Sequence, residues 1–262
     1  MAVLIMVPHL ASAAPSNFVG VNTHQPADDV LDACKSLGVS WVRIDFNWYQ
    51  AEPKQGQYSW ALFDKIINAA LARGLKVFPS VGYGPAWAKD PAHVNADGKT
   101  NNDTPKAGAY QNFCQAAAAR YKGKITHWGL WNEPNLDFLE STDKNVWINR
   151  IVIEGIKGIK AGCPSCKVLG PELASVGSVH ASWFDASLKA LKKAGLMYDI
   201  ITWHAYSTFH EIKPNLIPQC PTGDYFLHDV EKGRRCFGVL IGAKAPYEVM
   251  QDNKVSHLPF WL

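Results

Sequence analysis

The sequence predicts an α/β fold in which parallel strands alternate with helices, and three observations carry this prediction. Apolar residues recur at helical spacing in five segments, and each segment stops at a glycine suited to a helix end. Each glycine is followed by a run rich in Val, Ile and aromatic residues, as in a strand. Regular alternation of this kind is typical of parallel strands joined by crossover helices.

The expected elements follow one another along the chain. Strands are expected at residues 18–24, 39–48, 75–83, 124–134, 167–174 and 198–207, and helices at 28–38, 59–74, 110–123, 145–162 and 184–195. Residues 257–262 look like the start of a seventh strand. Two long loops, 85–108 and 208–246, follow the third and sixth strands, where the loops of a barrel shape its cleft.

Polar and aromatic residues gather at the carboxyl ends of nearly all these strands. They are His24, Asn47, Tyr83, Asn132, Glu133, Glu172, His204 and Tyr206. A barrel brings all its strand ends around one site, whereas a doubly wound sheet places its site at one crevice. No glycine-rich phosphate loop supports the doubly wound alternative. We therefore expect a (β/α)8 TIM barrel that is incomplete, with about six strands and a stub of the seventh.

Composition and charge narrow the class of protein. The 262 residues carry a net charge of +3, which gives no footprint for nucleic acid or for a charged membrane surface. Residues 1–14 hold an apolar run and an Ala-x-Ala-like "ASAAP" stretch, which predict the remnant of a signal peptide before a domain at 15–262. The run is too short to span a bilayer. We therefore expect a secreted protein, extracellular or periplasmic.

Six cysteines fit an exported protein with up to three disulfides. Cys220 and Cys236 flank a polar loop and are predicted to pair. Cys163 and Cys166, in "CPSC", are a weaker candidate pair, for which a structural disulfide or plain thiols are favoured over a redox or zinc site. We expect no metal and no cofactor, since a metal-dependent hydrolase on this fold needs a His-x-His pair and "VNTHQP" has one His.

Two strands show which of their faces is polar. In the second, Arg43, Asp45 and Asn47 alternate with apolar residues, so the polar set is expected to point into the barrel. In the sixth, His204 and Tyr206 are two residues apart and share a face. Two alternatives remain open: Arg43 could form a buried ion pair with Asp45, and His204 could be a satisfied core histidine.

The stretch "WNEPN", residues 131–135, ends the fourth strand. Pro134 cannot continue a strand ladder, so Glu133 is expected just past the strand, on the face where a barrel does its chemistry. A carboxyl group there suits general acid and base catalysis, and an exposed loop glutamate is the alternative. Trp48, Tyr83 and Trp87 could offer flat faces to sugar rings, although each could instead belong to the core.

The same stretch resembles clan A of the glycoside hydrolases, the retaining TIM-barrel glycosidases, and residues 41–77 resemble family 39, with family 5 nearby. The resemblance covers nearly all of residues 15–262. It implies that Glu133 is the acid/base, that Asn132 binds the sugar 2-hydroxyl and that Arg43 steadies the nucleophile. It also implies that His204 and Tyr206 line the site, and that the substrate is a poly- or oligosaccharide cleaved at an O-glycosidic bond.

The nucleophile of that clan is a glutamate at the end of strand seven. A retaining glycosidase needs two carboxylates about 5 Å apart, and the given sequence stops at "HLPFWL", just before that position. We therefore expect the nucleophile to follow Leu262, and residues 15–262 alone to form an inactive, open, aggregation-prone partial barrel. Glu172 is the strongest other carboxylate, with a loop or cleft-wall position favoured. The alternative function is a non-catalytic carbohydrate-binding pseudoenzyme on the same barrel.

Overall fold

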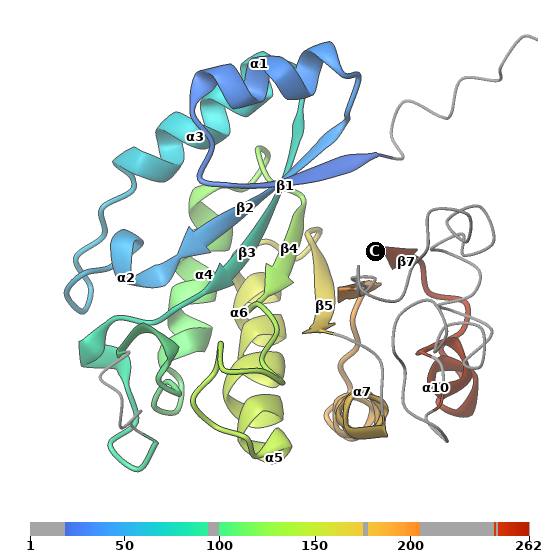
Figure 1. Cartoon of the computed structure of the whole chain (residues 1–262). Helices are drawn as coiled ribbons and strands as arrows, with labels where there is room; N and C mark the ends of the chain where they lie inside the picture. Colours follow the sequence, from blue (N-terminus) through green and yellow to red (C-terminus); the bar gives the residue numbers. More distant parts are fainter. Residues whose placement is uncertain (1–18, 94–99, 175–177, 205–243, 245, 262) are drawn as a thin grey trace, which may run out of the picture.

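Seven parallel strands form one sheet at the centre of the computed structural model, which describes residues 19–93, 100–174, 178–204, 244 and 246–261 (Figure 1). The strands are β1 (Gly20–His24), β2 (Trp41–Asn47), β3 (Lys76–Gly82), β4 (His127–Leu130), β5 (Lys167–Ala174), β6 (Ile200–His204) and β7 (Phe260–Trp261). Each strand pairs in parallel with the next in sequence. This order has no reversal point, so the prediction of an incomplete (β/α)8 barrel is confirmed.

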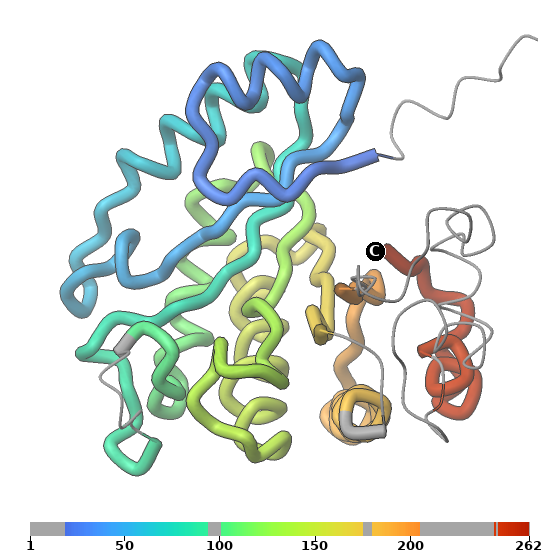
Figure 2. The backbone as a smooth tube through the Cα atoms, in the orientation of Figure 1, coloured from blue at the N-terminus to red at the C-terminus, as the bar shows by residue number. Residues whose placement is uncertain are grey.

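Helices cover the outer side of the curled sheet (Figure 2). The longer ones are α1 (Asp28–Ser36), α3 (Ala61–Ala72), α4 (Ala109–Arg120), α6 (Glu154–Gly162), α7 (Ser178–Lys193) and α10 (Pro246–Asp252). Shorter elements are α2 (Trp48–Ala51), α5 (Lys144–Trp147), the 3-10 turns η1 (Ala86–Ala88) and η2 (Thr100–Asn102), and the π-helical η3 (Ile148–Ile153), which joins α5 to α6. β1 and β7 lie at the two edges of the sheet.

The alternation predicted for β2 is confirmed. Val42, Ile44 and Phe46 are fully buried, and Phe46 stacks on Phe63 of α3 with ring centroids 4.0 Å apart. The polar residues between them lie on the opposite face of the strand and line a cavity at the strand ends. Since side chains alternate across a strand, the apolar set fixes the strand against the helices and thereby aims the polar set inward.

Glycine ends most of the helices as expected. Gly38, Gly74, Gly123 and Gly195 have φ between 67° and 83°, the left-handed conformation that follows a helix end. The fourth helix also ends at its expected glycine, but Gly162 is the last residue of α6, packs against α4 and is not in the left-handed conformation. A Cβ on Gly162 would lie 2.3 Å from a backbone oxygen of α4, so this glycine permits a close helix contact.

Strand four is shorter than predicted, because its ladder breaks before Pro134 is reached. β4 ends at Leu130, and Trp131 takes a left-handed backbone conformation with φ of 67°. The Trp131 indole is fully buried, and its Nε1 donates to the carbonyl of Phe138 at 2.7 Å. The Asn132–Glu133 pair that follows lies outside the β4 ladder, at the carboxyl end of the strand.

The cysteine predictions divide into two groups. Cys163 and Cys166 form a disulfide between the end of α6 and the start of β5, and both are buried, which confirms the structural interpretation of "CPSC". The predicted Cys220–Cys236 pair lies outside the described residues, as does the expected signal-peptide remnant at 1–14.

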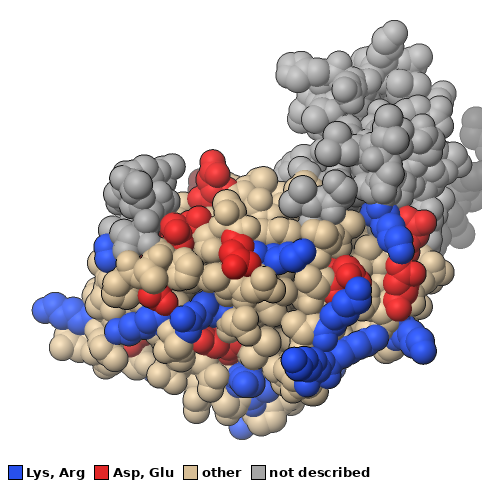
Figure 3. Space-filling view, turned by 90° about the horizontal axis from the view of Figure 1, so that it is seen from below, with Lys and Arg blue, Asp and Glu red and all other residues tan. Residues whose placement is uncertain are grey.

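Basic and acidic side chains lie among one another on the face that Figure 3 displays. Ion pairs on the described surface include Arg120 with Asp64 at 2.6 Å and Lys160 with Asp199 at 2.8 Å. Within the described residues no helix is long and apolar enough to cross a membrane.

Candidate active site

A cavity of about 490 Å³ opens at the carboxyl ends of the strands. Its volume falls in the range usual for small-molecule sites. Five of the predicted site residues line it together: Arg43 on β2, Tyr83 just after β3, Asn132 and Glu133 just after β4, and His204 on β6. The prediction that the strand ends converge on one place is thus confirmed for these residues, while their roles stay predictions.

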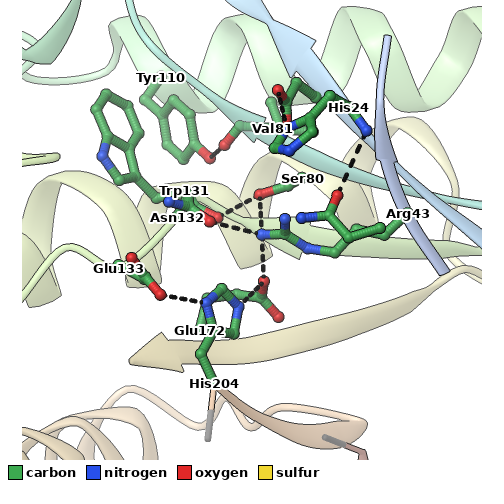
Figure 4. Close-up of polar contacts among 12 residues, drawn as sticks. His24, Arg43, Ser80, Val81, Tyr110, Trp131, Asn132, Glu133, Glu172 and His204 are labelled. Atoms are coloured by element: carbon green, nitrogen blue, oxygen red, sulfur yellow. Dashed lines mark hydrogen bonds and ion pairs between the residues drawn. The ribbon is translucent and has the colours of Figure 1, made fainter. Parts of the chain in front are cut away.

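Glu133 is held by the two strands that follow its own. Its backbone N–H donates to the carbonyl of Glu172 on β5 at 2.9 Å. Its carboxylate oxygen Oε1 lies 2.8 Å from Nδ1 of His204 on β6 (Figure 4). The carboxyl group is therefore at the cavity wall and fixed in direction, and with its side chain 13% exposed Glu133 is not the exposed loop glutamate of the alternative.

Arg43 pairs across the sheet and not along its own strand. Its Nη2 donates to Glu172 Oε2 at 2.9 Å, to Asn132 Oδ1 at 2.9 Å and to Ser80 Oγ at 3.0 Å. The alternative partner Asp45 is instead bound to His24, at 3.0 Å. The Arg43–Asp45 interpretation is therefore wrong, because Asp45 pairs with His24 on β1 and Arg43 pairs with Glu172 on β5.

Glu172 is buried, so the loop or cleft-wall position expected for it is wrong. The residue belongs to β5, is 1% exposed, and its Oε2 contacts Arg43 and, at 3.2 Å, Nε2 of His204. Burial by itself would raise the pKa of Glu172, but the charge of Arg43 and the hydrogen bond from His204 outweigh it and lower the pKa to about 2. Glu172 is thus a fixed negative charge beneath the cavity.

His204 lies between two carboxyl groups and lines the cavity, so the alternative of a satisfied core histidine does not describe its position. Burial lowers the pKa of its imidazole, but hydrogen bonds to Glu133 and Glu172 prevail and raise the pKa to about 8. The ring therefore carries a positive charge at neutral pH and lies between the carboxyl groups of Glu133 and Glu172.

Backbone strain concentrates at this end of the sheet. Six non-glycine residues of the described chain have positive φ, and five of them lie at the ends of β1, β3, β4 and β5: His24, Tyr83, Trp131, Glu133 and Glu172. Such conformations cost about 1–3 kcal/mol each and persist where surrounding contacts enforce them. The strain marks the same location as the cavity and the charged cluster.

Three aromatic predictions have different outcomes. Tyr83 lines the cavity, and burial raises the pKa of its hydroxyl to about 12. Trp48 does not offer a face to a ligand, because the chain turns into α2 after Asn47 and the fully buried indole stacks on Phe113. Trp87 is half-buried with its Nε1 bonded to a backbone carbonyl, and it does not line the cavity. Tyr206 lies outside the described residues.

Further lining residues were not among the predicted site residues. Asn22 and Asp45 extend the wall on β1 and β2, and Asn101 and Asn102 reach it from the long loop after β3. The alternation on β2 was a sufficient signal for Asp45, whereas nothing in the sequence singled out two asparagines within a polar loop. Within the described residues, no group of three or more His, Cys, Asp and Glu side chains has the arrangement of a metal site.

The chain has measurable similarity to known glycosidases. Residues 21–129 match a family model described as beta-galactosidase. An endo-1,4-beta-xylanase A from Fusarium oxysporum f. sp. lycopersici is 29% identical over 117 residues, which is 43% of this chain and 33% of the relative. An endo-1,4-beta-xylanase 1 from Gibberella zeae is 34% identical over 109 residues, which is 40% of this chain and 28% of the relative.

Solved structures show the same fold. A family 39 beta-xylosidase from Caulobacter crescentus superimposes with a TM-score of 0.66 at 21% identity, over 94% of this chain and 53% of that protein. The chain thus spans between about a quarter and a half of the length of the proteins it matches. Together with the site geometry, these matches confirm that the chain resembles clan A of the glycoside hydrolases, with family 39 among its structural neighbours.

Proposed function

We propose that the whole protein containing this chain hydrolyses O-glycosidic bonds with Glu133 as its general acid and base. The observation that carries the proposal is the Asn132–Glu133 pair, which leaves the sheet after β4 and lines the cavity with Glu133 anchored on His204. A strand end of a (β/α)8 barrel is where catalytic groups of this fold lie.

The proposed reaction proceeds in two displacements. Protonated Glu133 gives its proton to the glycosidic oxygen as the bond to the anomeric carbon breaks, while a second carboxylate attacks that carbon from the opposite face. Ionised Glu133 then takes a proton from water, whose oxygen displaces the enzyme carboxylate. The configuration at the anomeric carbon is retained. We place the second carboxylate after β7, beyond Leu262, as the resemblance to clan A implies.

The substrate we propose is a β-linked xylose oligomer or polymer. The relatives carry the names xylanase and xylosidase, and the cavity is lined by amide, carboxylate and hydroxyl groups suited to a ligand rich in hydroxyls. The Asn132 amide, whose oxygen accepts from Arg43, would present its N–H groups to the sugar.

The test compares Glu133→Gln with the unchanged whole protein on two sets of β-xylosides. With poor leaving groups, we expect kcat/KM to fall about 100- to 10,000-fold, because these depend on protonation. With activated aryl leaving groups, the first displacement should be nearly unaffected. Equal losses on both sets would remove Glu133 from the acid role, and xylan binding without any hydrolysis would support the pseudoenzyme instead.

We also propose that the protein is exported. The apolar run and "ASAAP" stretch of residues 1–14 support this, and so does the buried Cys163–Cys166 disulfide, since disulfides persist in oxidising compartments. Amino-terminal sequencing of the protein recovered outside the cytoplasm should begin near residue 15, and an intact Met1 there would oppose cleavage.

A further inference from the structure

We propose that Glu172 is a positioning residue whose buried carboxylate binds Arg43 and His204 together and through them orients Asn132 and Glu133. The inference rests on the proposed role of Glu133. The Glu172 side chain reaches both members of the Asn-Glu pair indirectly, through other side chains, and the Glu172 backbone contacts Glu133 directly. Three routes, each a chain of hydrogen bonds, connect Glu172 to Asn132 or Glu133.

The first route runs through Arg43. Its Nη2 donates to Glu172 Oε2 and to Asn132 Oδ1, both at 2.9 Å. A guanidinium has donors and no acceptor, so the Asn132 atom facing it must be the amide oxygen. The Asn132 NH₂ group is thereby turned away from Arg43 as a donor. The Glu172 charge offsets that of Arg43, which allows the guanidinium to remain only 13% exposed.

The second route runs through His204, whose two ring nitrogens face two different carboxylates. Nε2 lies 3.2 Å from Glu172 Oε2, and Nδ1 lies 2.8 Å from Glu133 Oε1. Because ionised Glu172 can only accept, Nε2 must carry a proton. Nδ1 is then the nitrogen that shares a proton with Glu133, either as an imidazolium donor or as an acceptor from the protonated acid. Glu172 therefore fixes which nitrogen serves the acid.

The third route is the backbone. The Glu133 N–H donates to the Glu172 carbonyl at 2.9 Å, and both residues have positive φ, 45° and 56°. Each strained conformation needs outside support. The charged contacts of the Glu172 side chain supply that support on β5, and the hydrogen bond transmits it to the loop that carries Glu133.

Burial separates this role from that of a nucleophile. Glu172 is 1% exposed, does not line the cavity, and its Oε2 is engaged by two cationic side chains. A nucleophilic carboxylate must reach the anomeric carbon, whereas Glu172 Oε1, which has no hydrogen-bond partner among the described residues, is itself buried away from the cavity. The titratable and charged groups of the described chain that face His204 are Glu133 from the β4 loop, Glu172 from β5 and Arg43 from β2, so removing the Glu172 charge leaves Glu133 as the carboxyl partner of His204 in that part of the chain.

The test uses Glu172→Gln, Glu172→Asp and, as a matched control, Glu52→Gln in the whole protein. Gln keeps the shape and loses the charge, whereas Asp keeps the charge. Glu52 is another buried carboxylate, 4% exposed, and it accepts a hydrogen bond from Trp48 Nε1 at 2.7 Å. Glu52 does not line the cavity. The readouts are kcat and KM on β-xylosides and the NMR titration of ¹⁵N-labelled His204, assigned by its loss in His204→Gln.

For Glu172→Gln we expect kcat to fall about 10- to 100-fold with little change in KM, and the His204 titration to move to lower pH. Glu172→Asp should recover part of the lost kcat and part of the shift in the His204 titration. If the Gln variant does not fold, the Asp variant alone tests whether the position of the Glu172 charge affects His204. Glu52→Gln should leave the His204 titration in place. An unmoved titration in both Glu172 variants would overturn the proposal, as would covalent labelling of Glu172 by a mechanism-based xyloside. The titration remains informative even if no glycoside is cleaved.

Discussion

Two histidine–carboxylate pairs lie at opposite sides of the same cavity, and their surroundings differ. On the β1–β2 side, His24 Nδ1 lies 3.0 Å from Asp45 Oδ2, with side chains 73% and 29% exposed. On the β4–β6 side, His204 contacts Glu133 at 2.8 Å and Glu172 at 3.2 Å, and His204 is 14% exposed. The bond lengths are similar, so distance alone does not distinguish the pairs.

The two pairs differ in how far they are removed from water and in the presence of a further charged group, Arg43, on the β4–β6 side. Water screens the His24–Asp45 pair, and exposed pairs of this kind contribute little to stability. At the other pair, Arg43 and His204 outweigh the effect of burial and keep Glu172 ionised, and hydrogen bonds to the two carboxyl groups keep the imidazole in its charged form. The charge state of the histidine at these strand ends therefore depends on the groups behind each pair. On the β4–β6 side that group is Arg43 of β2, which is 13% exposed and pairs with Glu172.

The largest effect should follow from removing that arginine. Arg43→Met leaves Glu172 buried without its main counter-charge, and we expect the free energy of unfolding to fall by about 3–5 kcal/mol. Arg120→Met is the matched control, since Arg120 pairs with Asp64 at the surface and its loss should matter far less. Chemical denaturation of both variants measures the difference, and equal losses would show that burial of the cluster is not decisive.

A smaller effect concerns pH. The pKa of His204 is raised from 6.5 to about 8, so its stabilisation is full below pH 6.5 and is lost as pH rises through 8. The change in the His204 pKa on folding corresponds to about 2 kcal/mol of folding free energy. The pKa of Glu172 is lowered from 4.5 to about 2, so its stabilisation is full above pH 4.5 and is lost as pH falls towards 2.

Unfolding free energies measured across this range check both signs. His204→Gln should abolish the loss between pH 6.5 and 8, whereas His24→Gln should leave that loss in place. If His24→Gln also abolished the loss of unfolding free energy between pH 6.5 and 8, the exposed pair would be as strongly coupled as the buried one, and burial would not distinguish the two pairs.

Local patterns in the sequence were sufficient for the parts of this structure that depend on periodicity. The alternation on β2 aimed Arg43 inward, and the proline after Glu133 marked a strand end, although Trp131 breaks the ladder earlier. The position of Glu172 depends on contacts with Arg43, 129 residues away in sequence, and no local pattern encodes such a contact. Trp48 was misplaced because a short helix, α2, begins where the strand was expected to continue.

The most direct measurement is a crystal structure of the whole protein carrying Glu133→Gln, with a xylo-oligosaccharide bound in the cavity. We expect the amide that replaces the Glu133 carboxyl group to lie within about 2.6–3.2 Å of the glycosidic oxygen, and the Asn132 NH₂ group to bind a sugar hydroxyl. Glu172 should remain on Arg43 and His204 without touching the sugar. A sugar bound elsewhere, or one that contacts Glu172 in place of the substituted side chain, would contradict the role proposed for Glu133.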